Sequence, residues 1–564
     1  MTPTTPTASR DQEVVICGAG PTGLTLSILL SRFGIRHLVI DRRETVSGLP
    51  RARGINHRTG EIWQLLGLGE ALRSATLPPE WLERMVYQET LAGPLIGTVE
   101  TPGNLPGASS HLTPSDTYCI SQDRTDALLA RHAATYREAS IRFSTEFVGL
   151  RQRPDGVDLT LRTGAGEEHI RAAWLIGCDG TASDVRAAAE IPRVRLATMD
   201  SFVNAHFVAD LRRWTQNRKA VLLWNMREGV EGVFGPLDGE NYWRCQINFD
   251  PAQDAPDSWT ADKVMARIRT MIGATGADMP SAELRSFYPF EVRAGLAAHF
   301  VSGRILLAGD AAHQIPPHGA LGMNTGVQTA HNLAWKLAAV IKGEASGCLL
   351  ESYEAERREV AERVIGHAIS NYERVVRIRK KGTPEQRRDN VRGARGYGNA
   401  LGLDLGVHYS RGALIAEEQG GPYGEEPSTE YLPTAAPGWR APHFWVRRAA
   451  GRISSIALSD GCFALLAGRD GDAWVAAARD LDVSRLYAGT VGPSGDIVPD
   501  EQVFEDLYGL DRTGCVLIRP DGHVAFRSRT CPADPRAALM RVVEAIGLAD
   551  VEVVSRPRAH ITPA

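Results

Sequence analysis

The sequence predicts an α/β fold built from several domains, and three observations carry this prediction. A length of 564 residues exceeds what one hydrophobic core usually fills. Three segments between residues 14 and 341 each consist of an apolar strand, a glycine turn and a helix, the order expected for a parallel sheet covered by helices. Between the second and the third of them, residues 195–300 alternate apolar and polar side chains, which is typical of an antiparallel sheet.

The composition is that of an ordinary globular protein. It is 43% hydrophobic and 23% charged with a net charge of -4, so we expect neither nucleic acid nor a membrane surface as a partner. No apolar run approaches the roughly 20 residues that span a bilayer. The eight cysteines are scattered without a CxxC or Cys/His cluster, which predicts reduced thiols in a cytoplasmic protein and no metal site.

The first of the three segments has the pattern of a dinucleotide-binding unit. Gly18, Gly20 and Gly23 follow an apolar strand with the GxGxxG spacing. In such a unit the first glycine permits a tight turn, the second lets the backbone approach a pyrophosphate, and the third lets the helix lie close to the strand. Pro21 and Thr22 open the helix, whose unpaired N–H groups and dipole favour an anion.

A carboxylate and a basic loop follow this unit. Asp41 ends the second apolar strand, where an acid accepts from a ribose hydroxyl of NAD or FAD and disfavours a 2′-phosphate. Arg42, Arg51, Arg53 and Arg58 are candidates to neutralise a pyrophosphate, and the alternative is that they are solvated loop arginines.

Two further strand ends carry an acid beside a glycine. AAWLIGCDG ends in Asp179 and Gly180 before a helix, and RILLAGD ends in Gly309 and Asp310 before a Pro/Gly loop and a helix predicted to begin near Asn324. A plain NAD dehydrogenase needs neither of these segments.

The remaining regions are less specific. Residues 76–115 predict irregular structure or short strands, and the basic, polar residues 380–396 predict a linker or an exposed segment. A separate unit begins near residue 404, with a strand at CFALLAG, a hairpin turning at Asp521 and Gly522, and a closing helix. For the aromatic side chains of the β-rich region a core role is favoured over a ligand-binding one; these are Trp224, Phe234, Tyr242, Trp243, Phe287, Tyr288 and Phe290.

Together the three motifs resemble the FAD fingerprints of the class A flavoprotein monooxygenases, the aromatic hydroxylase family of p-hydroxybenzoate hydroxylase and phenol hydroxylase. The resemblance implies FAD as cofactor, with Gln122 and Arg51 beside it, the backbone of Val148 at the adenine and Asp310 at the ribityl chain. The residues that the motifs and the resemblance together place at FAD are Gly18, Gly20, Pro21, Thr22, Gly23, Asp41, Arg42, Arg51, Gln122, Val148, Asp179, Gly180, Gly309, Asp310, Pro317, Gly322, Met323 and Asn324.

The resemblance also implies the domain order. A Rossmann-like FAD-binding domain comprises residues 11–190 and 291–400, and an inserted antiparallel-sheet substrate domain comprises residues 191–290. Residues 404–564 resemble the thioredoxin-like C-terminal domain of phenol hydroxylase and of polyketide hydroxylases. Because this domain has no CxxC, we expect it to be structural or to stabilise a homodimer.

The function implied is that of an FAD-dependent monooxygenase that consumes NADPH or NADH. It would insert one oxygen atom from O2 into an aromatic small molecule, phenolic or polyketide-like, through a flavin C4a-hydroperoxide. Epoxidation and Baeyer–Villiger oxygen insertion on the same scaffold remain alternatives, as does a reductase or a non-redox FAD-binding protein.

Three points about the flavin's surroundings stay open. His318 and His206 could accept the proton of a phenolic substrate, but a structural role is favoured for both, so the catalytic residue is left unassigned. Thr329 stands where most relatives carry an acid, and Leu321 replaces a common polar residue.

Overall fold

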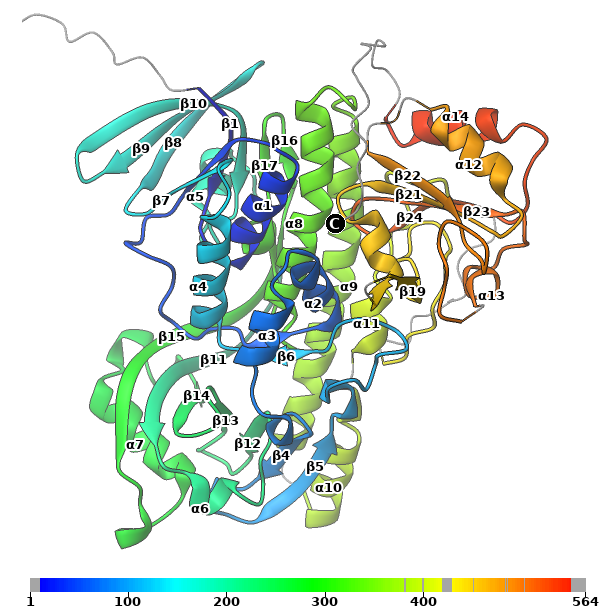
Figure 1. The fold of residues 1–564 in the computed structure, drawn as a ribbon. Coiled ribbons are helices and arrows are strands. Elements are labelled where there is room, and N and C mark those ends of the chain that lie inside the picture. Colours follow the sequence, from blue (N-terminus) through cyan, green and yellow to red (C-terminus); the bar gives the residue numbers. More distant parts are fainter. Residues whose placement is uncertain are drawn as a thin grey trace, which may run out of the picture.

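The computed structural model describes residues 11–379, 382–397, 400–417, 429–449, 451–481, 483, 485–501 and 503–548. It confirms the α/β fold: two eight-stranded sheets lie one above the other, and a four-stranded sheet lies beside them (Figure 1). Two long helices, α8 (Leu321–Ile341) and α9 (Leu349–Arg379), connect the three parts.

The first sheet carries all three glycine motifs at one edge. Strands β17, β10, β1, β2 and β7 are parallel, so their carboxyl ends, and the turns that follow, meet on the same side. Helices α1 (Pro21–Arg32) and α8 pack on this sheet, which explains its nearly continuous apolar strands. The strands are β16 (Val301–Ser302), β17 (Ile305–Leu307), β10 (Gly166–Gly177), β1 (Asp11–Cys17), β2 (His37–Ile40) and β7 (Ala139–Arg142), with β8 (Glu146–Arg153) and β9 (Gly156–Thr163) pairing beside β10.

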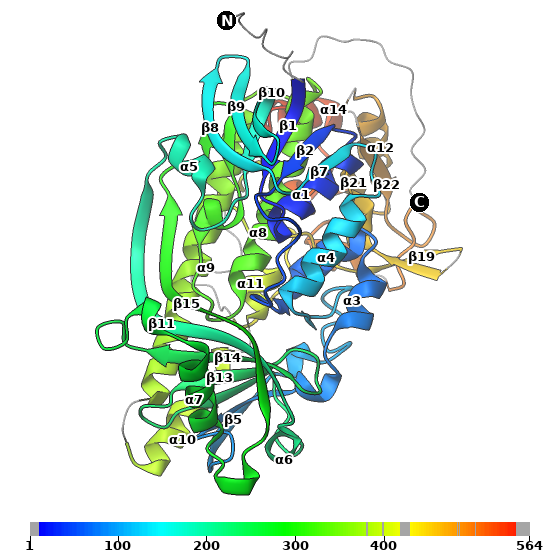
Figure 2. The same cartoon turned by 90° about the vertical axis from the view of Figure 1, so that its left-hand side faces the viewer.

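The second sheet is mostly antiparallel, as the alternation predicts. Its two longest strands, β11 and β15, run side by side from the level of the first sheet into the second sheet (Figure 2). One face packs on helix α7 (Ala261–Ile272) in a separate hydrophobic core. In spatial order the strands are β18 (His313–Gln314), β15 (Ala282–Ala297), β11 (Arg193–Ala209), β14 (Tyr242–Phe249), β13 (Gly232–Pro236), β12 (Leu222–Asn225), β4 (Arg84–Gln88) and β5 (Leu95–Glu100).

Of the two alternatives for residues 380–396, a linker is wrong for residues 384–392, which form a helix, whereas an exposed segment is right, because most residues of that helix are exposed. A helix, α10 (Pro384–Arg392), begins there because Thr383 and Gln386 form a reciprocal capping box and Pro384 occupies the first turn. The helix covers the edge strand β5, where a Cβ on Gly97 would lie 3.1 Å from the Val391 side chain.

The C-terminal unit is thioredoxin-like. Its strand order is β22-β21-β23-β24, with the first pair parallel and the others antiparallel, and α12 and α14 pack against each other. The predicted hairpin and closing helix are confirmed. The elements are β21 (Phe463–Ala467), α12 (Asp472–Arg479), β22 (Leu486–Thr490), β23 (Cys515–Ile518), β24 (Val524–Ser528) and α14 (Pro535–Ala545).

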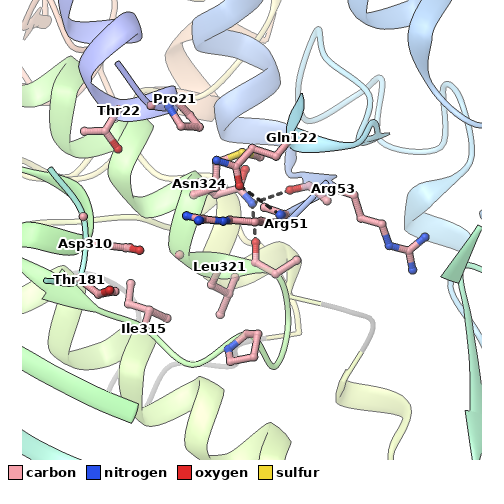
Figure 3. A pocket seen from close by; sticks show the side chains of 18 of the residues that line it. Pro21, Thr22, Arg51, Arg53, Gln122, Thr181, Asp310, Ile315, Leu321 and Asn324 are labelled. Carbon is pink, nitrogen blue, oxygen red and sulfur yellow. Dashed lines mark hydrogen bonds between the residues drawn. The ribbon is translucent and has the colours of Figure 1, made fainter. Parts of the chain in front are cut away.

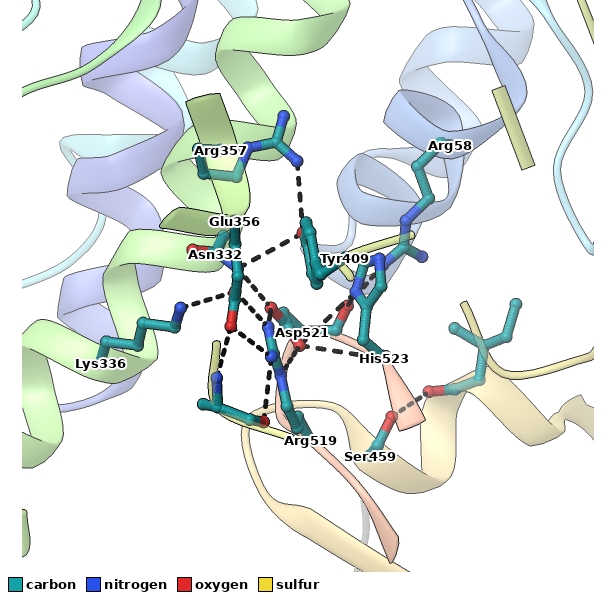
Figure 4. Close-up of polar contacts among 12 residues, drawn as sticks. Arg58, Asn332, Lys336, Glu356, Arg357, Tyr409, Ser459, Arg519, Asp521 and His523 are labelled. Atoms are coloured by element: carbon teal, nitrogen blue, oxygen red, sulfur yellow. Dashed lines mark hydrogen bonds and ion pairs between the residues drawn. The ribbon is translucent and has the colours of Figure 1, made fainter. Parts of the chain in front are cut away.

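Buried charges join this unit to α8 and α9. Glu356 on α9 accepts from Lys336 at 2.6 Å and from both terminal nitrogens of Arg519 at 2.8 and 2.9 Å (Figure 4). Arg519 also pairs with Asp521 at the hairpin turn, and none of these four side chains is more than 1% exposed. The contact is therefore a continuous ionic core.

The residues that the structure describes include neither a membrane span nor a metal-binding cluster. Among them no helix has the length and hydropathy needed to cross a bilayer. Within the same residues no cluster of three or more His, Cys, Asp or Glu is placed to hold a metal ion.

Candidate active site

A cavity of about 840 Å³ lies between the first two sheets. Its upper wall is the carboxyl edge of the first sheet and the loop before α8, and its lower wall is the face of the second sheet opposite α7. Most of the predicted FAD residues line it, and Figure 3 shows ten of the lining side chains labelled.

The glycine turn is built for close backbone contact. Gly18 has φ +110°, and a Cβ there would lie 2.4 Å from the Cys178 carbonyl oxygen. A Cβ on Gly23 would lie 2.0 Å from the Gly18 oxygen, whereas a Cβ on Gly20 would meet nothing within 4 Å. No side chain caps α1 at Gly20, so the first N–H groups of this helix point toward open space.

Asp41 is held in its ionised form. Burial would raise its pKa, but hydrogen bonds from Arg43 and from the backbone N–H of Ala19, at 2.8 Å, keep that pKa below its ordinary value. Asp41 lines the cavity beside Arg42, whose exposed side chain lies 3.8 Å from Asp184.

Asp179 organises the second motif. Its carboxylate accepts from Ser183 Oγ at 2.6 Å and from the N–H of Val185 at 3.0 Å, which fixes the turn into helix α5 (Asp184–Ala188). Burial raises the pKa of Asp179. Gly180, with φ +83°, follows it on the cavity wall.

Asp310 offers a free acceptor to the cavity. Among the described residues no donor bonds to its carboxylate. Desolvation by the surrounding protein raises the pKa of Asp310, and the charges of Arg193 and Arg51 oppose this shift. The preceding Gly309 has φ +61°, and a Cβ there would lie 2.6 Å from Thr22 Oγ1, so α1 and this turn pack closely.

Helix α8 begins earlier than predicted, at Leu321. Its N-cap, Ala320, has φ +58° and gives no side-chain cap, so the first N–H groups of α8 are open on the cavity side. Asn324 in this turn accepts from the N–H of Asn56 at 3.1 Å and donates to the Gly54 oxygen at 3.0 Å. The Asn324 side chain therefore links the first turn of α8 to the short strand that begins at Gly54. The cavity wall here also includes Pro317, Gly322 and Met323.

Gln122 holds the basic loop in place. Its Oε1 accepts from the N–H of Ala52 at 3.2 Å, and the loop on either side presents Arg51 and Arg53 to the cavity. Arg58 is not there: it is buried against Glu61, at 2.8 Å, facing the C-terminal domain, so its candidacy for a pyrophosphate is wrong.

Val148 does not line the cavity, although its neighbours Glu146 and Phe147 do. The pairing of β8 with β9 shifts register at Val148, and a bulge residue is left out of the ladder. Its backbone is thus suited to an external partner, and the adenine contact remains a prediction.

The lower wall follows the alternation of the second sheet. On β14, Trp243, Cys245 and Ile247 enter the core with α7, whereas Arg244 and Gln246 face the cavity. The expectation of core aromatics holds for Phe234, Trp243 and Phe287, and also for Trp224, which belongs to another buried core cluster although it lines the cavity as well. It is wrong for Tyr288 and Phe290, which line the cavity because they alternate with Phe287 along β15.

Neither histidine is placed as an effective base. His206 lies behind the wall, bonded to Asn204 and to Ser286 Oγ at 2.8 Å. His318 lines the cavity, but burial lowers its pKa to about 4, so it is a weak base. The favoured structural roles therefore fit both residues.

Thr329 makes specific contacts in place of an acid. Its hydroxyl donates to the Thr325 carbonyl at 2.8 Å and accepts from Arg357 Nε at 3.2 Å. His313 Nε2 lies 3.0 Å from the same oxygen. The Thr329 hydroxyl therefore accepts the hydrogen bond of the buried Arg357, which an acid at this position would otherwise accept.

Several cavity residues carry no recognisable motif in the sequence. Arg244, Gln246 and Asn204 stand at alternating positions, but alternation does not say which face is the core. Asp404, on α11 (Leu401–Leu405), accepts from Asn56 Nδ2 at 2.8 Å, and burial raises its pKa to about 7. No local signal identifies it.

This arrangement fits FAD. The uncapped start of α1 suits a pyrophosphate, the free Asp310 carboxylate suits a hydroxyl chain, and the uncapped start of α8 suits a flavin ring that gains negative charge. Fold and site thus define an FAD-binding enzyme with an aromatic-lined pocket.

Comparisons with known proteins agree. The FAD binding domain family matches residues 11–368, and the family "Aromatic-ring hydroxylase, C-terminal" matches residues 434–546. The chain is 33% identical to the tetracenomycin A2 monooxygenase-dioxygenase of Streptomyces glaucescens, over 96% of this chain and 97% of that protein.

Solved structures give the same result. The flavin-dependent monooxygenase PieE, in complex with FAD and substrate, has a TM-score of 0.87 at 30% identity, covering 95% of this chain and 99% of that one. A ternary complex of aklavinone-11 hydroxylase with FAD and aklavinone has a TM-score of 0.83 at 30% identity over the same shares. The chain belongs to the family of FAD-dependent aromatic-ring hydroxylases, and it is a flavoprotein monooxygenase.

Proposed function

We propose that this enzyme uses NADPH or NADH and O2 to hydroxylate a phenolic or polyketide-like aromatic molecule. The observation that carries the proposal is one cavity that joins a nucleotide-binding edge to an apolar, aromatic-lined wall. In the overall reaction the nicotinamide loses a hydride, one oxygen atom enters the substrate, and the other leaves as water.

The chain's own groups would hold the cofactor along the upper wall. The first turn of α1, with Gly20 and Thr22, would take the pyrophosphate, and Asp41 a ribose hydroxyl. Asp310 would accept from the ribityl chain, and the N–H groups after Ala320 would face the flavin ring. The further FAD contacts predicted from the sequence, at Arg42, Arg51, Gln122 and the backbone of Val148, are part of this proposal.

Bound FAD supplies the redox chemistry, by the hydroperoxide route that the family resemblance implies. The protein's contribution is to orient the substrate and exclude water. Phe202 and Phe290 stack with ring centroids 5.8 Å apart on the lower wall, and Trp224 and Val233 are almost fully buried there. Apolar side chains of this kind would shield the reacting atoms from solvent.

The test is a reduction and turnover experiment. The holoenzyme is mixed anaerobically with NADPH or NADH, with and without a polyphenolic aromatic compound, while the flavin absorption is followed. We expect the aromatic compound to accelerate bleaching, and in air we expect O2 uptake to match hydroxylated product. A flavin that no nicotinamide reduces would overturn the proposal, and an epoxide or lactone product would replace hydroxylation by one of its alternatives.

A further inference from the structure

We propose that the substrate is an aromatic acid, whose carboxylate binds between the guanidinium groups of Arg53 and Arg244. This proposal rests on the proposed function, since it names the class of substrate for the same cavity. It assigns specificity to Arg53 of the basic loop and to Arg244 of the lower wall, neither of which the family motifs include.

The two arginines reach the same part of the cavity from different elements. Arg244 on β14 is the cross-strand neighbour of Gly235 on β13. A Cβ on Gly235 would lie 2.5 Å from a terminal nitrogen of Arg53, so only a glycine leaves room for Arg53 beside Arg244. Both arginines line the cavity, and Figure 3 shows the Arg53 side chain extending away from Arg51.

These two cations have no counter-charge in the part of the chain that the structure describes. Arg53 is 6% exposed and donates to the carbonyl oxygens of Val221 and, at 2.8 Å, Pro236. Arg244 donates to the Arg51 oxygen at 3.2 Å, and its buried Nε has no partner. No described carboxylate forms an ion pair with either arginine.

The unpaired charges disfavour the protonated form of Arg244. Burial, together with the neighbouring charge of Arg53, lowers the pKa of Arg244 to about 10. Buried charges are normally paired, and an unpaired one is strongly destabilising. An anion that enters the cavity would relieve this repulsion, so the site is poised to prefer a charged ligand.

A carboxylate on an aromatic ring matches the surroundings. The planar guanidinium fork binds a carboxylate through two parallel hydrogen bonds. The neighbouring wall includes the apolar side chains of Trp224, Val233 and Leu222, which suit the ring. The phosphates of FAD have a separate proposed place at the start of α1, which leaves these two arginines for the substrate.

The test compares an acid with its neutral analogue. The FAD-loaded enzyme is titrated with 3-hydroxy-2-naphthoic acid and with 3-hydroxy-2-naphthamide, following the flavin absorption. We expect the acid to bind at least about tenfold more tightly. Arg244→Gln should remove this preference by weakening the acid alone, and Arg244→Lys should retain part of it. Arg285→Gln, at an exposed residue paired with Glu283, is the control and should change neither affinity.

Every result decides the proposal. Equal behaviour of acid and amide toward the unaltered enzyme, whether both bind or neither does, overturns it. A loss of FAD from Arg244→Gln, with the acid preference unchanged in the remaining holoenzyme, would assign the arginines to a cofactor phosphate and overturn it too. Because the titration needs neither nicotinamide nor O2, a failure of turnover with an intact acid preference would count against the proposed function alone.

Discussion

Single buried carboxylates give this fold a measurable dependence on pH. Asp126 on α4 (Gln122–Ala133) is fully buried, accepts from Gln122 at 3.3 Å and has one oxygen without a partner. Burial raises its pKa to about 7. Between about pH 4 and pH 7 the folded protein holds a proton that the unfolded chain has released, so stability falls as the pH rises through this window.

Asp126→Asn removes that penalty. We expect the variant to gain stability over the unaltered protein at pH 8, on the order of 3 kcal/mol, and to gain little at pH 4. Urea unfolding at both pH values measures the difference. Asp257→Asn, at an exposed residue, is the control. A gain that is equal at both pH values would contradict the assignment of the penalty to Asp126.

Two substitutions in the glycine turn distinguish an effect on FAD affinity from an effect on folding stability. A Cβ at Gly20 meets nothing within 4 Å, so Gly20→Ala should cost the FAD-free protein no more than about 1 kcal/mol, from the poorer N-cap alone. Because the new methyl group would occupy the space of the pyrophosphate, FAD affinity should fall by about tenfold or more. Gly23→Ala, with its Cβ 2.0 Å from the Gly18 oxygen, should lower stability as well.

Calorimetry of the FAD-free proteins and titration with FAD measure the two effects. If Gly20→Ala bound FAD normally, the pyrophosphate would lie elsewhere.

At the level of elements, local sequence signals predicted the strands and helices around the glycine motifs but not which strands pair in the second sheet. The apolar runs before Gly18, Asp179 and Asp310 are strands whose parallel order follows from the motifs. The membership of β4 and β5 in the second sheet depends on pairing with β12, far along the chain, and no local pattern encodes it. For the same reason the sequence does not tell which alternate side chains of β14 face the cavity. That Arg244 is one of them is apparent only in the assembled sheet.

Helix α10 protects the open edge of that sheet. An uncovered edge strand presents unpaired backbone groups, and α10 packs over β5 through Val391. Thr383→Ala removes the cap and should cost about 1 kcal/mol locally, so amide exchange should speed up in residues 384–392 and 95–100. Thr383→Ser keeps the capping oxygen and should exchange like the unaltered protein. Unchanged exchange in Thr383→Ala would mean that the cap does not hold this helix.

At the scale of the whole molecule, buried ion pairs join the C-terminal part of the chain to α2 (His57–Leu65). Glu61 on α2 pairs with Arg440 from the C-terminal part and with Arg58, and Glu61 and Arg440 are no more than 1% exposed. Burial alone would raise the pKa of Glu61, but Arg440 and Arg58 lower it to about 2. The carboxylate therefore contributes stability above its ordinary pKa, and that contribution is lost as the pH falls toward 2.

A double-mutant cycle tests this coupling. Glu61→Gln and Arg440→Gln should each cost about 3–5 kcal/mol at pH 7, because each leaves a buried charge without its partner. The double variant should cost less than the sum of the two by about 1–3 kcal/mol. The same cycle on the exposed pair Glu385 and Arg388 should give less than about 1 kcal/mol. Additive costs at Glu61 and Arg440, or a coupling that does not shrink as the pH falls below about 4.5, would show that this interface is held by apolar packing and not by its charges.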